Sequence, residues 1–338
     1  MIVYVKKMTN NKKLYPIKDS CFYKLSNKKK LYEFLKTDSK SIKKFLISGD
    51  NNFLETKASN NRLNRIKDLN QSKYHEQEII ELDGNNFVIT QDKTRLCQTP
   101  KGNKNYGLYK IHKRIADLLS SIETKEYVFS GIKGKSYIDN AKFHLDNSDN
   151  FIVKLDIKRF FPSVTSKYIF RFFRNDLKCS PDISKILTDL LAYKNHIPTG
   201  SPVSMILAYW SNFKMFDEIY ELSRLKNCKM SLWVDDIIIS GEKASEVAWE
   251  AKKIIINHGL KYHDKKFKIY KPKENKEITG VIITPDGKIK LRNRSHVKIY
   301  HLKNKKDKTS EEISKLNSYL NEARQIEPNK YTKVKKNS

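Results

Sequence analysis

The sequence predicts an α+β fold in which helices pack on one face of an antiparallel sheet. A chain of 338 residues is long enough to bury a hydrophobic core. Through its middle, short β-forming apolar runs are mixed with segments of helical periodicity. Strands and helices in this mixed order are typical of one sheet covered by a layer of helices.

The first part of the chain predicts small elements that precede this sheet. Residues 1–75 are rich in Lys, Asn and Ser and carry short helical patterns, which indicate a helical lead-in. Residues 86–100 hold two β-forming runs around a polar turn at 91–94, which predicts a β-hairpin that could serve as a basic finger. Apolar residues between 111 and 122 recur at helical spacing and predict an amphipathic helix.

The expected core elements follow from there. In chain order they are a strand at 151–157, helices at 181–193 and 205–222, an apolar β-forming run at 230–240, a helix that stops at Gly259, and strands near 268–270 and 278–284. Beyond residue 288 the chain is strongly basic, and the spacing of Ile313, Leu316 and Leu320 predicts a helix with one apolar face. The alternative for this region is a solvated basic tail without specific contacts.

The charge balance indicates a polyanionic partner. Lys and Arg total 67 against 38 Asp and Glu, so the formal net charge is +29. Basic proteins neutralise phosphates and release counterions, which makes nucleic acid the first candidate and an acidic membrane surface the second. A lysine-rich surface without such a partner is the simpler alternative.

Cysteine spacing and hydropathy limit the compartment. The cysteines lie far apart without a C-x-x-C pair, which argues against a zinc site or a disulfide framework and favours a reducing environment; they are Cys21, Cys97, Cys179 and Cys228. No leader-like apolar segment and no run of about 18 apolar residues is evident, so we expect a cytoplasmic protein that does not span a membrane.

Three carboxylates interrupt apolar strands and are candidates for chemistry. Asp235 and Asp236 stand within an apolar β-forming run, and Asp156 ends the predicted strand before it. Because unpaired buried carboxylates are costly, we expect Asp235 and Asp236 at a hairpin tip, where they meet a cation. Three such acids could bind two divalent ions about 4 Å apart for an in-line displacement at phosphorus, and Mg²⁺ prefers oxygen ligands. Ordinary solvated turn or helix-cap residues are the alternative for each.

Between these acids, residues 197–204 (IPTGSPVS) form a tight turn that opens a long helix. Gly200 would permit close approach of the backbone to a nucleotide or template, and amides at a helix N-terminus favour phosphate. A plain Pro/Gly loop at a helix start explains the pattern as well.

Taken in order, these segments resemble the reverse transcriptases from about residue 22 to residue 283. Motifs A, B and C of that family are matched by LDIKRFFPS at 155–163, PTGSP at 198–202 and WVDD at 233–236, and Lys266 falls where the motif D lysine is expected. Two residues depart from the usual pattern, Trp233 from Tyr and Thr199 from Gln. Both changes should keep shape more than hydrogen bonding, so activity should survive while fidelity could differ.

Within that family the sequence resembles the bacterial retron enzymes. NAKFH at 140–144 matches their N-A-x-x-H motif, and ITG at 278–280 matches their V-T-G motif with Ile for Val. A core or surface role for His144 and a plain strand-to-turn at 278–280 remain the simpler alternatives.

The resemblance implies a right-hand polymerase with fingers, a ferredoxin-like antiparallel palm and a helical basic thumb. The expected segments are a helical lead-in at 1–75, fingers at 76–150, a palm at 151–290 with a finger insertion at about 165–200, and a thumb and basic tail at 291–338.

The resemblance also implies roles for single residues. The catalytic metal ligands for two Mg²⁺ ions would be Asp156, Asp235, Asp236 and the carbonyl of Ile157. The nucleotide-binding residues would be Lys93, Arg95, Phe161 as the sugar gate, Thr199, Gly200 and Lys266, the last assisting departure of pyrophosphate. The RNA-binding residues would be Asn140, His144, Arg292, Arg294 and Lys298.

The implied function is an RNA-directed DNA polymerase that uses dNTPs and a cognate noncoding RNA. Retron enzymes start at a 2′-hydroxyl of the folded RNA and make RNA-linked single-stranded DNA (msDNA), which often joins a nearby-encoded effector protein in anti-phage defence. Two alternatives remain open: a group II intron-like or abortive-infection reverse transcriptase, and a protein whose RNA and DNA scaffold an effector. A folded RNA gene immediately upstream would favour the retron.

Overall fold

The computed structural model describes residues 14–58, 61–66, 79–82, 85–91 and 95–331, with the backbone alone between 58 and 95. The chain forms two compact units, and it enters each of them three times. The first unit comprises Met1–Glu55, Gln98–Glu126 and Arg159–Phe213; the second comprises Thr56–Cys97, Tyr127–Lys158 and Lys214–Ser338. These units do not follow the predicted borders of lead-in, fingers, palm and thumb, and that division stays a prediction.

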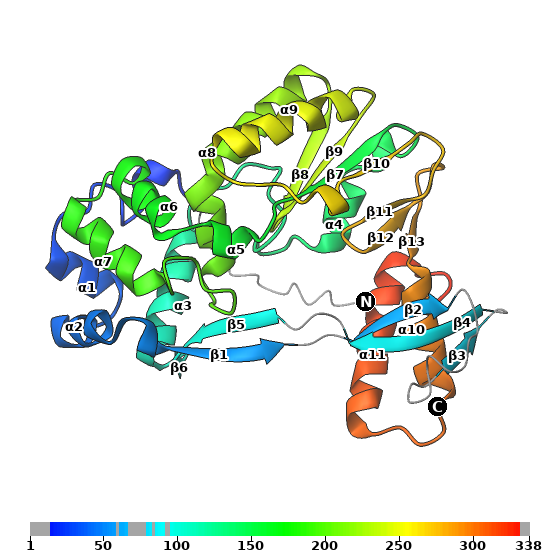
Figure 1. Cartoon of the computed structure of the whole chain (residues 1–338), viewed down its shortest axis with the longest axis horizontal. Coiled ribbons are helices and arrows are strands. Elements are labelled where there is room, and N and C mark those ends of the chain that lie inside the picture. The colour runs from blue at the N-terminus through cyan, green and yellow to red at the C-terminus, as the bar shows by residue number, and fades with distance from the viewer. Residues whose placement is uncertain (1–13, 59–60, 67–78, 83–84, 92–94, 332–338) are drawn as a thin grey trace, which may run out of the picture. The chain divides into compact units, whose positions relative to one another are not determined.

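The first unit is mainly helical (Figure 1). Its helices are α1 (Lys28–Phe34), α2 (Ser39–Ser48), α3 (Gly107–Leu119), α5 (Phe160–Ser163), α6 (Ser166–Arg171), α7 (Pro181–Leu191) and the first half of α8 (Ser204–Leu225). Local sequence explains several helix starts. Asn27 and Asp38 accept hydrogen bonds from the backbone at the N-termini of α1 and α2, and Pro181 opens α7.

The second unit is built on a four-stranded antiparallel sheet. Its strand order is β10 (Lys268–Tyr270), β7 (Ile152–Asp156), β9 (Asp236–Ser240) and β8 (Lys229–Trp233). β7 and β9 bury apolar side chains at successive positions, as strands covered on both faces do. Helix α9 (Ala244–Asn257) contributes Val247, Ala251 and Ile255 to the core and ends two residues before Gly259, whose φ is +82°. The predicted α+β class and its antiparallel sheet are therefore confirmed.

A second antiparallel sheet carries the C-terminal helices of the same unit. β11 (Lys276–Ile278), β12 (Val281–Ile283) and β13 (Ile289–Leu291) pair in sequence, and α10 (Asn293–Asn304) and α11 (Ser310–Ile326) follow. Ile299, Ala323 and Ile326 share one hydrophobic core with these strands, with α4 (Tyr137–Lys142) and with Ile152 and Ile238 of the larger sheet. The basic C-terminal region is thus packed against the core up to residue 326 and is not a solvated tail.

Two local predictions were wrong in part. The expected helical lead-in does form α1 and α2, but its second half contains β1 (Phe53–Ala58) and β2 (Asn61–Ile66), which are followed by β3 (Ile79–Leu82). β4 (Asn85–Gln91) and β5 (Arg95–Pro100) both form, but β4 pairs with β2 and β3 while β5 pairs with β1, so they do not make one hairpin. The pattern of a strand predicts that it forms, whereas its partner depends on segments far away in the sequence. Among the helices of the described residues, none is both long and apolar enough to cross a membrane.

Candidate active site

The tip between β8 and β9 presents the paired acids. Trp233 and Asp236 are register partners, so Val234 and Asp235 form a two-residue turn. Val234 has φ +58°, a conformation that is costly for a β-branched residue and that Gly usually supplies at this turn position. Its backbone N–H donates to Ser130 Oγ at 2.8 Å. Backbone strain of this kind persists only where surrounding contacts hold it, and it is frequent at functional sites.

The third acid comes from the neighbouring strand. Asp156 is the last residue of β7 and is the register partner of Asp236. One residue on, the Ile157 N–H donates to the carbonyl oxygen of Asp235 at 3.0 Å. The pairing of two strands therefore brings the three carboxyl-bearing residues to the same end of one sheet.

Burial and mutual repulsion raise the pKa values of the paired acids at this end of the sheet. Burial, followed by the charges of Asp156 and Asp236, raises the pKa of Asp235 to about 6. Burial also raises the pKa of Asp236, against the lowering effect of Lys154. Asp156 is only 6% exposed. Like charges held this close favour the binding of a cation.

Lys266 partly neutralises the cluster. The Lys266 Nζ lies 2.6 Å from Asp156 Oδ2. The segment before it is pinned to the end of β7, because Lys158 N–H donates to the carbonyl of Lys261 and His263 N–H donates to the carbonyl of Asp156, both at 2.7 Å. The sequence predicted Lys266 in the site, and the structure places its ammonium on a predicted metal ligand.

The donor set fits magnesium by its chemistry, since carboxylate and carbonyl oxygens are the ligands that this ion prefers. The side chains are not arranged around an ion in advance: in the described ranges, no group of three or more His, Cys, Asp and Glu side chains has the geometry of a metal site. Lys266 also holds one Asp156 oxygen. The assignment of two Mg²⁺ ions to Asp156, Ile157, Asp235 and Asp236 stays a prediction.

The glycine-containing loop before α8 belongs to the first unit and docks on β5. The Thr199 N–H donates to Gln98 Oε1 at 3.0 Å, and the Gly200 N–H donates to the Gln98 carbonyl at 3.1 Å. A Cβ at Gly200 would lie 2.7 Å from Thr99 Oγ1, so this position requires glycine for contact with a strand. The sequence had predicted close approach of Gly200 to a nucleotide or template. That additional contact stays a prediction.

The structure describes only some of the remaining predicted nucleotide-binding residues. In the first unit Phe160 is 3% exposed and Phe161 is half-buried, so Phe161 is the more accessible ring of the pair. Lys93 lies outside the described residues, and only the backbone of Arg95 is described, in β5. Their roles stay predictions.

A comparison with protein families identifies the family of the segment that carries these acids. The family described as "Reverse transcriptase (RNA-dependent DNA polymerase)" matches residues 100–283, more than half of the chain. The chain belongs to the reverse transcriptase family. The matched segment contains Asp156, Asp235, Asp236 and Lys266, the residues that the sheet and its neighbouring segment bring together.

Curated relatives of this reverse transcriptase are retron enzymes, as the sequence resemblance indicated. It is 32% identical over 171 residues to the Retron Se72 reverse transcriptase of Salmonella heidelberg (strain 579083-10), covering 50% of this chain and 43% of that protein. To the Retron Ec86 reverse transcriptase of Escherichia coli it is 27% identical over 195 residues, covering 56% and 60%. The chain thus spans about half of the length of these relatives. A solved structure of apo telomerase from Candida tropicalis, truncated from the C-terminal domain, matches with a TM-score of 0.44 and 10% identity over 75% of this chain and 59% of that one.

The N-A-x-x-H residues of this reverse transcriptase lie inside the second unit. His144 is fully buried, and its Nδ1 and Nε2 lie 2.7 Å from the hydroxyls of Ser240 and Ser231, which join the ring to β9 and β8. Asn140 is fully buried as well, and neither of its amide atoms has a hydrogen-bond partner. Neither side chain has surface that RNA could contact, so the predicted direct RNA contacts do not fit their placement. Two serines within apolar strands were the signal that sequence reasoning missed.

The burial of His144 predicts acid sensitivity. Burial, with a smaller effect of Lys229, lowers its pKa to about 3, so the unfolded chain takes up a proton near pH 6.5 while the folded ring stays neutral. Its contribution to the free energy of unfolding is complete above pH 6.5 and is lost as the pH falls, by about 2 kcal/mol at pH 5. Urea unfolding at pH 7.5 and pH 5 should show this loss in the wild type and a smaller one in His144→Gln. His258→Gln, at a partly exposed histidine paired with Glu218, is the control and should keep the full loss; equal losses in all three proteins would contradict the expectation.

The I-T-G residues form the turn between β11 and β12. Ile278 and Val281 are register partners, and Thr279 and Gly280 between them both have positive φ, the geometry of a type I′ hairpin turn. A Cβ at Gly280 would lie 3.2 Å from Arg292 Cζ, so the glycine leaves room for this guanidinium. Thr279 Oγ1 donates to the carbonyl of Tyr137 at 2.8 Å. The motif is therefore a turn that seats a predicted RNA-binding arginine.

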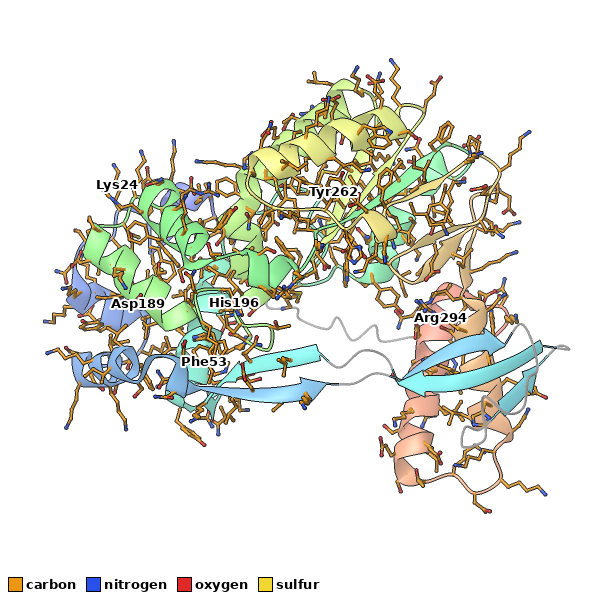
Figure 2. All side chains as sticks on the ribbon, viewed as in Figure 1. Lys24, Phe53, Asp189, His196, Tyr262 and Arg294 are labelled. Atoms are coloured by element: carbon orange, nitrogen blue, oxygen red, sulfur yellow. The ribbon has the colours of Figure 1, made fainter. Side chains whose placement is uncertain are left out.

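The predicted basic residues of α10 gather around one acid. Arg292 and Arg294 approach Glu277 Oε1 at 3.3 and 3.0 Å, and Arg294 stands at the start of α10 (Figure 2). Burial, then the charges of Arg294 and Arg292, lowers the pKa of Lys298. The charges of Arg292 and Arg294 thus reach Lys298, where Glu322 opposes them, and a bound anion would add to this compensation.

Proposed function

We propose that this reverse transcriptase is a retron-type RNA-directed DNA polymerase, which copies a folded noncoding RNA into RNA-linked single-stranded DNA. The observation that carries the proposal is the strand register that gathers Asp156, Asp235 and Asp236 at one sheet end, inside the segment that matches the family. The names of the curated relatives support the retron type. The resemblance further implies an effector protein encoded nearby and a role of the RNA-linked DNA in anti-phage defence.

In this proposal the three aspartates and the Ile157 carbonyl hold two Mg²⁺ ions, which would supply activation of the attacking hydroxyl and neutralisation of the departing pyrophosphate. Lys266 compensates the charge of Asp156 while no nucleotide is present. When a dNTP binds, we expect the Lys266 ammonium to move from Asp156 to the triphosphate and to assist departure of the pyrophosphate. The Val234 turn, held by Ser130, keeps Asp235 aimed at the reacting groups.

The other predicted residues complete the proposal. Lys93 and Arg95 would bind the triphosphate, Phe161 would contact the sugar, and Thr199 and Gly200 would line the nucleotide or template. The cations Arg292, Arg294 and Lys298 would bind RNA phosphates, because the two arginines lie near enough to Lys298 for their charges to act on it. Asn140 and His144 would act indirectly by fixing α4 against the strands that carry the acids.

The nucleic acid that copurifies with the protein tests the function. The protein would be expressed together with its native flanking DNA, and the bound nucleic acid would be sequenced before and after debranching and RNase treatment. We expect one RNA species joined through a 2′-hydroxyl to a single DNA. DNA of random sequence would favour the abortive-infection type, and unbranched complementary DNA would favour the group II intron-like type. Bound RNA without any DNA synthesis would favour a scaffolding protein.

Phe161→Ala should admit ribonucleotides. An aromatic ring beneath the sugar would clash with a 2′-hydroxyl, and its removal should lower the preference for dNTP over rNTP about tenfold or more. Primer extension with each nucleotide class measures the ratio of kcat/KM. Phe160→Ala is the matched comparison, since that ring is buried and should affect stability more than sugar choice. A ratio unchanged in Phe161→Ala but lowered in Phe160→Ala would move the gate to Phe160.

A further inference from the structure

A lysine of α9 is enclosed by aromatic rings. Lys252 is 6% exposed, and its Nζ lies 3.4 Å from the ring centroid of Phe267, 3.9 Å from that of Trp249 and 4.8 Å from that of Tyr262. The rings of Trp249 and Phe267 are themselves 5.6 Å apart. An ammonium within about 6 Å of an aromatic face is attracted by the ring, and here three rings surround one cation.

The rings come from two different segments. Trp249 lies one turn before Lys252 on α9, whereas Tyr262 and Phe267 belong to the segment between α9 and β10, where Figure 2 labels Tyr262. The lysine therefore joins this segment to the helix. Burial lowers the pKa of Lys252, and Asp264, also in that segment, opposes the shift. An apolar side chain would fill this place on α9 without the free-energy cost of burying a charge, as Ala251 and Ile255 do nearby.

The same segment is fixed on its other side to the end of β7. Lys158 and His263 donate backbone hydrogen bonds across this junction at 2.7 Å, and Tyr262 forms a bridge with Ile157. Lys266 lies between the two attachments, in the 3-10 helix Asp264–Lys266 directly before Phe267. Its Nζ is 2.6 Å from Asp156 Oδ2.

We propose that Lys252 is a positioning residue of the polymerase site: held by Trp249, Tyr262 and Phe267, its ammonium fixes the 261–267 segment and so places Lys266 beside Asp156. The inference rests on the proposed polymerase function for its catalytic consequence, but not for its structural one. Lys252 itself does not reach the acids; it acts through Lys266. The cage formed by these three rings keeps the 261–267 segment ordered on α9. The Lys266 side chain, which is about half-exposed, remains able to leave Asp156 for another anion.

Hydrogen exchange tests the structural part without any assay of activity. In Lys252→Met, which keeps the length of the side chain and removes its charge, the amides of His263, Lys266 and Phe267 should exchange at least about tenfold faster than in the wild type. Lys252→Arg should restore most of the protection. Lys253→Met is the matched control, because Lys253 is the exposed neighbour on α9 and pairs with Glu250. Unchanged exchange in Lys252→Met would overturn the proposal. If that variant does not fold, Phe267→Leu weakens the cage from the other side, and unchanged exchange of His263 and Lys266 there would count equally against it.

A double-mutant cycle tests the catalytic part. Lys252→Met should lower kcat for dNTP incorporation about tenfold and change the KM for dNTP less than about twofold, since the lost interaction acts in the transition state. In a Lys266→Met background the same change should lower kcat no further, because the residue through which it acts is gone. Losses of kcat that add in the double variant would overturn the proposal. A wild type without polymerase activity would instead contradict the proposed function, and the exchange result would still decide the role of the cage.

Discussion

Asp235→Asn should abolish DNA synthesis, lowering kcat on the order of a thousandfold or more, while the protein stays folded. The amide keeps the shape of the side chain but removes an anionic oxygen ligand from the tip of the hairpin. Since burial and the charges of Asp156 and Asp236 oppose the ionised form of Asp235, the metal-free protein should lose no stability. Primer extension on an RNA template in Mg²⁺ measures the first effect, and thermal unfolding measures the second. Asp156→Asn should behave alike.

Magnesium titration separates the loss of a ligand from other causes. Ions that bind only the folded state raise Tm by an amount that grows with the logarithm of their concentration relative to Kd, so added Mg²⁺ should stabilise the wild type and stabilise Asp235→Asn clearly less. Asp286→Asn is the matched control, because that aspartate is exposed in a turn and paired with Lys288. It should keep both polymerase activity and the Mg²⁺ effect. Near-normal synthesis by Asp235→Asn would remove the two-metal assignment.

The convergence of the three acids could be predicted from the strand patterns once the two runs were taken as neighbours in one sheet. An apolar run that ends in Asp156, and another that is interrupted by Asp235 and Asp236, place carboxylates at strand ends whenever the two runs are antiparallel neighbours. The hairpin formed where the sequence placed it. The order of the motifs indicated the reverse transcriptases, and the family match agrees with that resemblance.

Other features lay beyond sequence reasoning for physical reasons. β5 has the expected strand pattern, but its partner β1 is about forty residues away, and no local signal names it. His144 matched a motif, yet its burial depends on Ser231 and Ser240, which meet it only in the folded sheet. Lys252 is one of many lysines in the sequence, and only the fold distinguishes it by surrounding it with rings.

The packing of the C-terminal helices changes how their RNA-binding role should be tested. Removing residues from Val297 onward would take Ile299, Ala323 and Ile326 out of a core that they share with Ile238 of β9. Core truncations of this size cost several kcal/mol, so a deletion would disturb the sheet of the acids as well as the RNA contacts. Substitution of surface charges leaves that core in place and is therefore the sharper experiment.

The combined variant Arg292→Gln, Arg294→Gln and Lys298→Gln should weaken binding of the cognate folded RNA by roughly 30- to 100-fold at low salt. Each lost phosphate contact also flattens the dependence of log K on log salt by about 0.7 to 0.9, so the slope should fall by about 2 to 3. Labelled noncoding RNA titrated at several salt concentrations measures both.

The control is a variant with equal loss of charge at ion-paired surface lysines elsewhere, Lys113→Gln, Lys185→Gln and Lys253→Gln. Arg292 is partly buried against Gly280, so the double variant of Arg294 and Lys298 serves if the triple one unfolds, with an expected slope change of about 1.4 to 1.8. RNA affinity and salt slope that match the control in a folded variant would mean that this surface binds no phosphate, and the template would then have to be held by other cations of the chain.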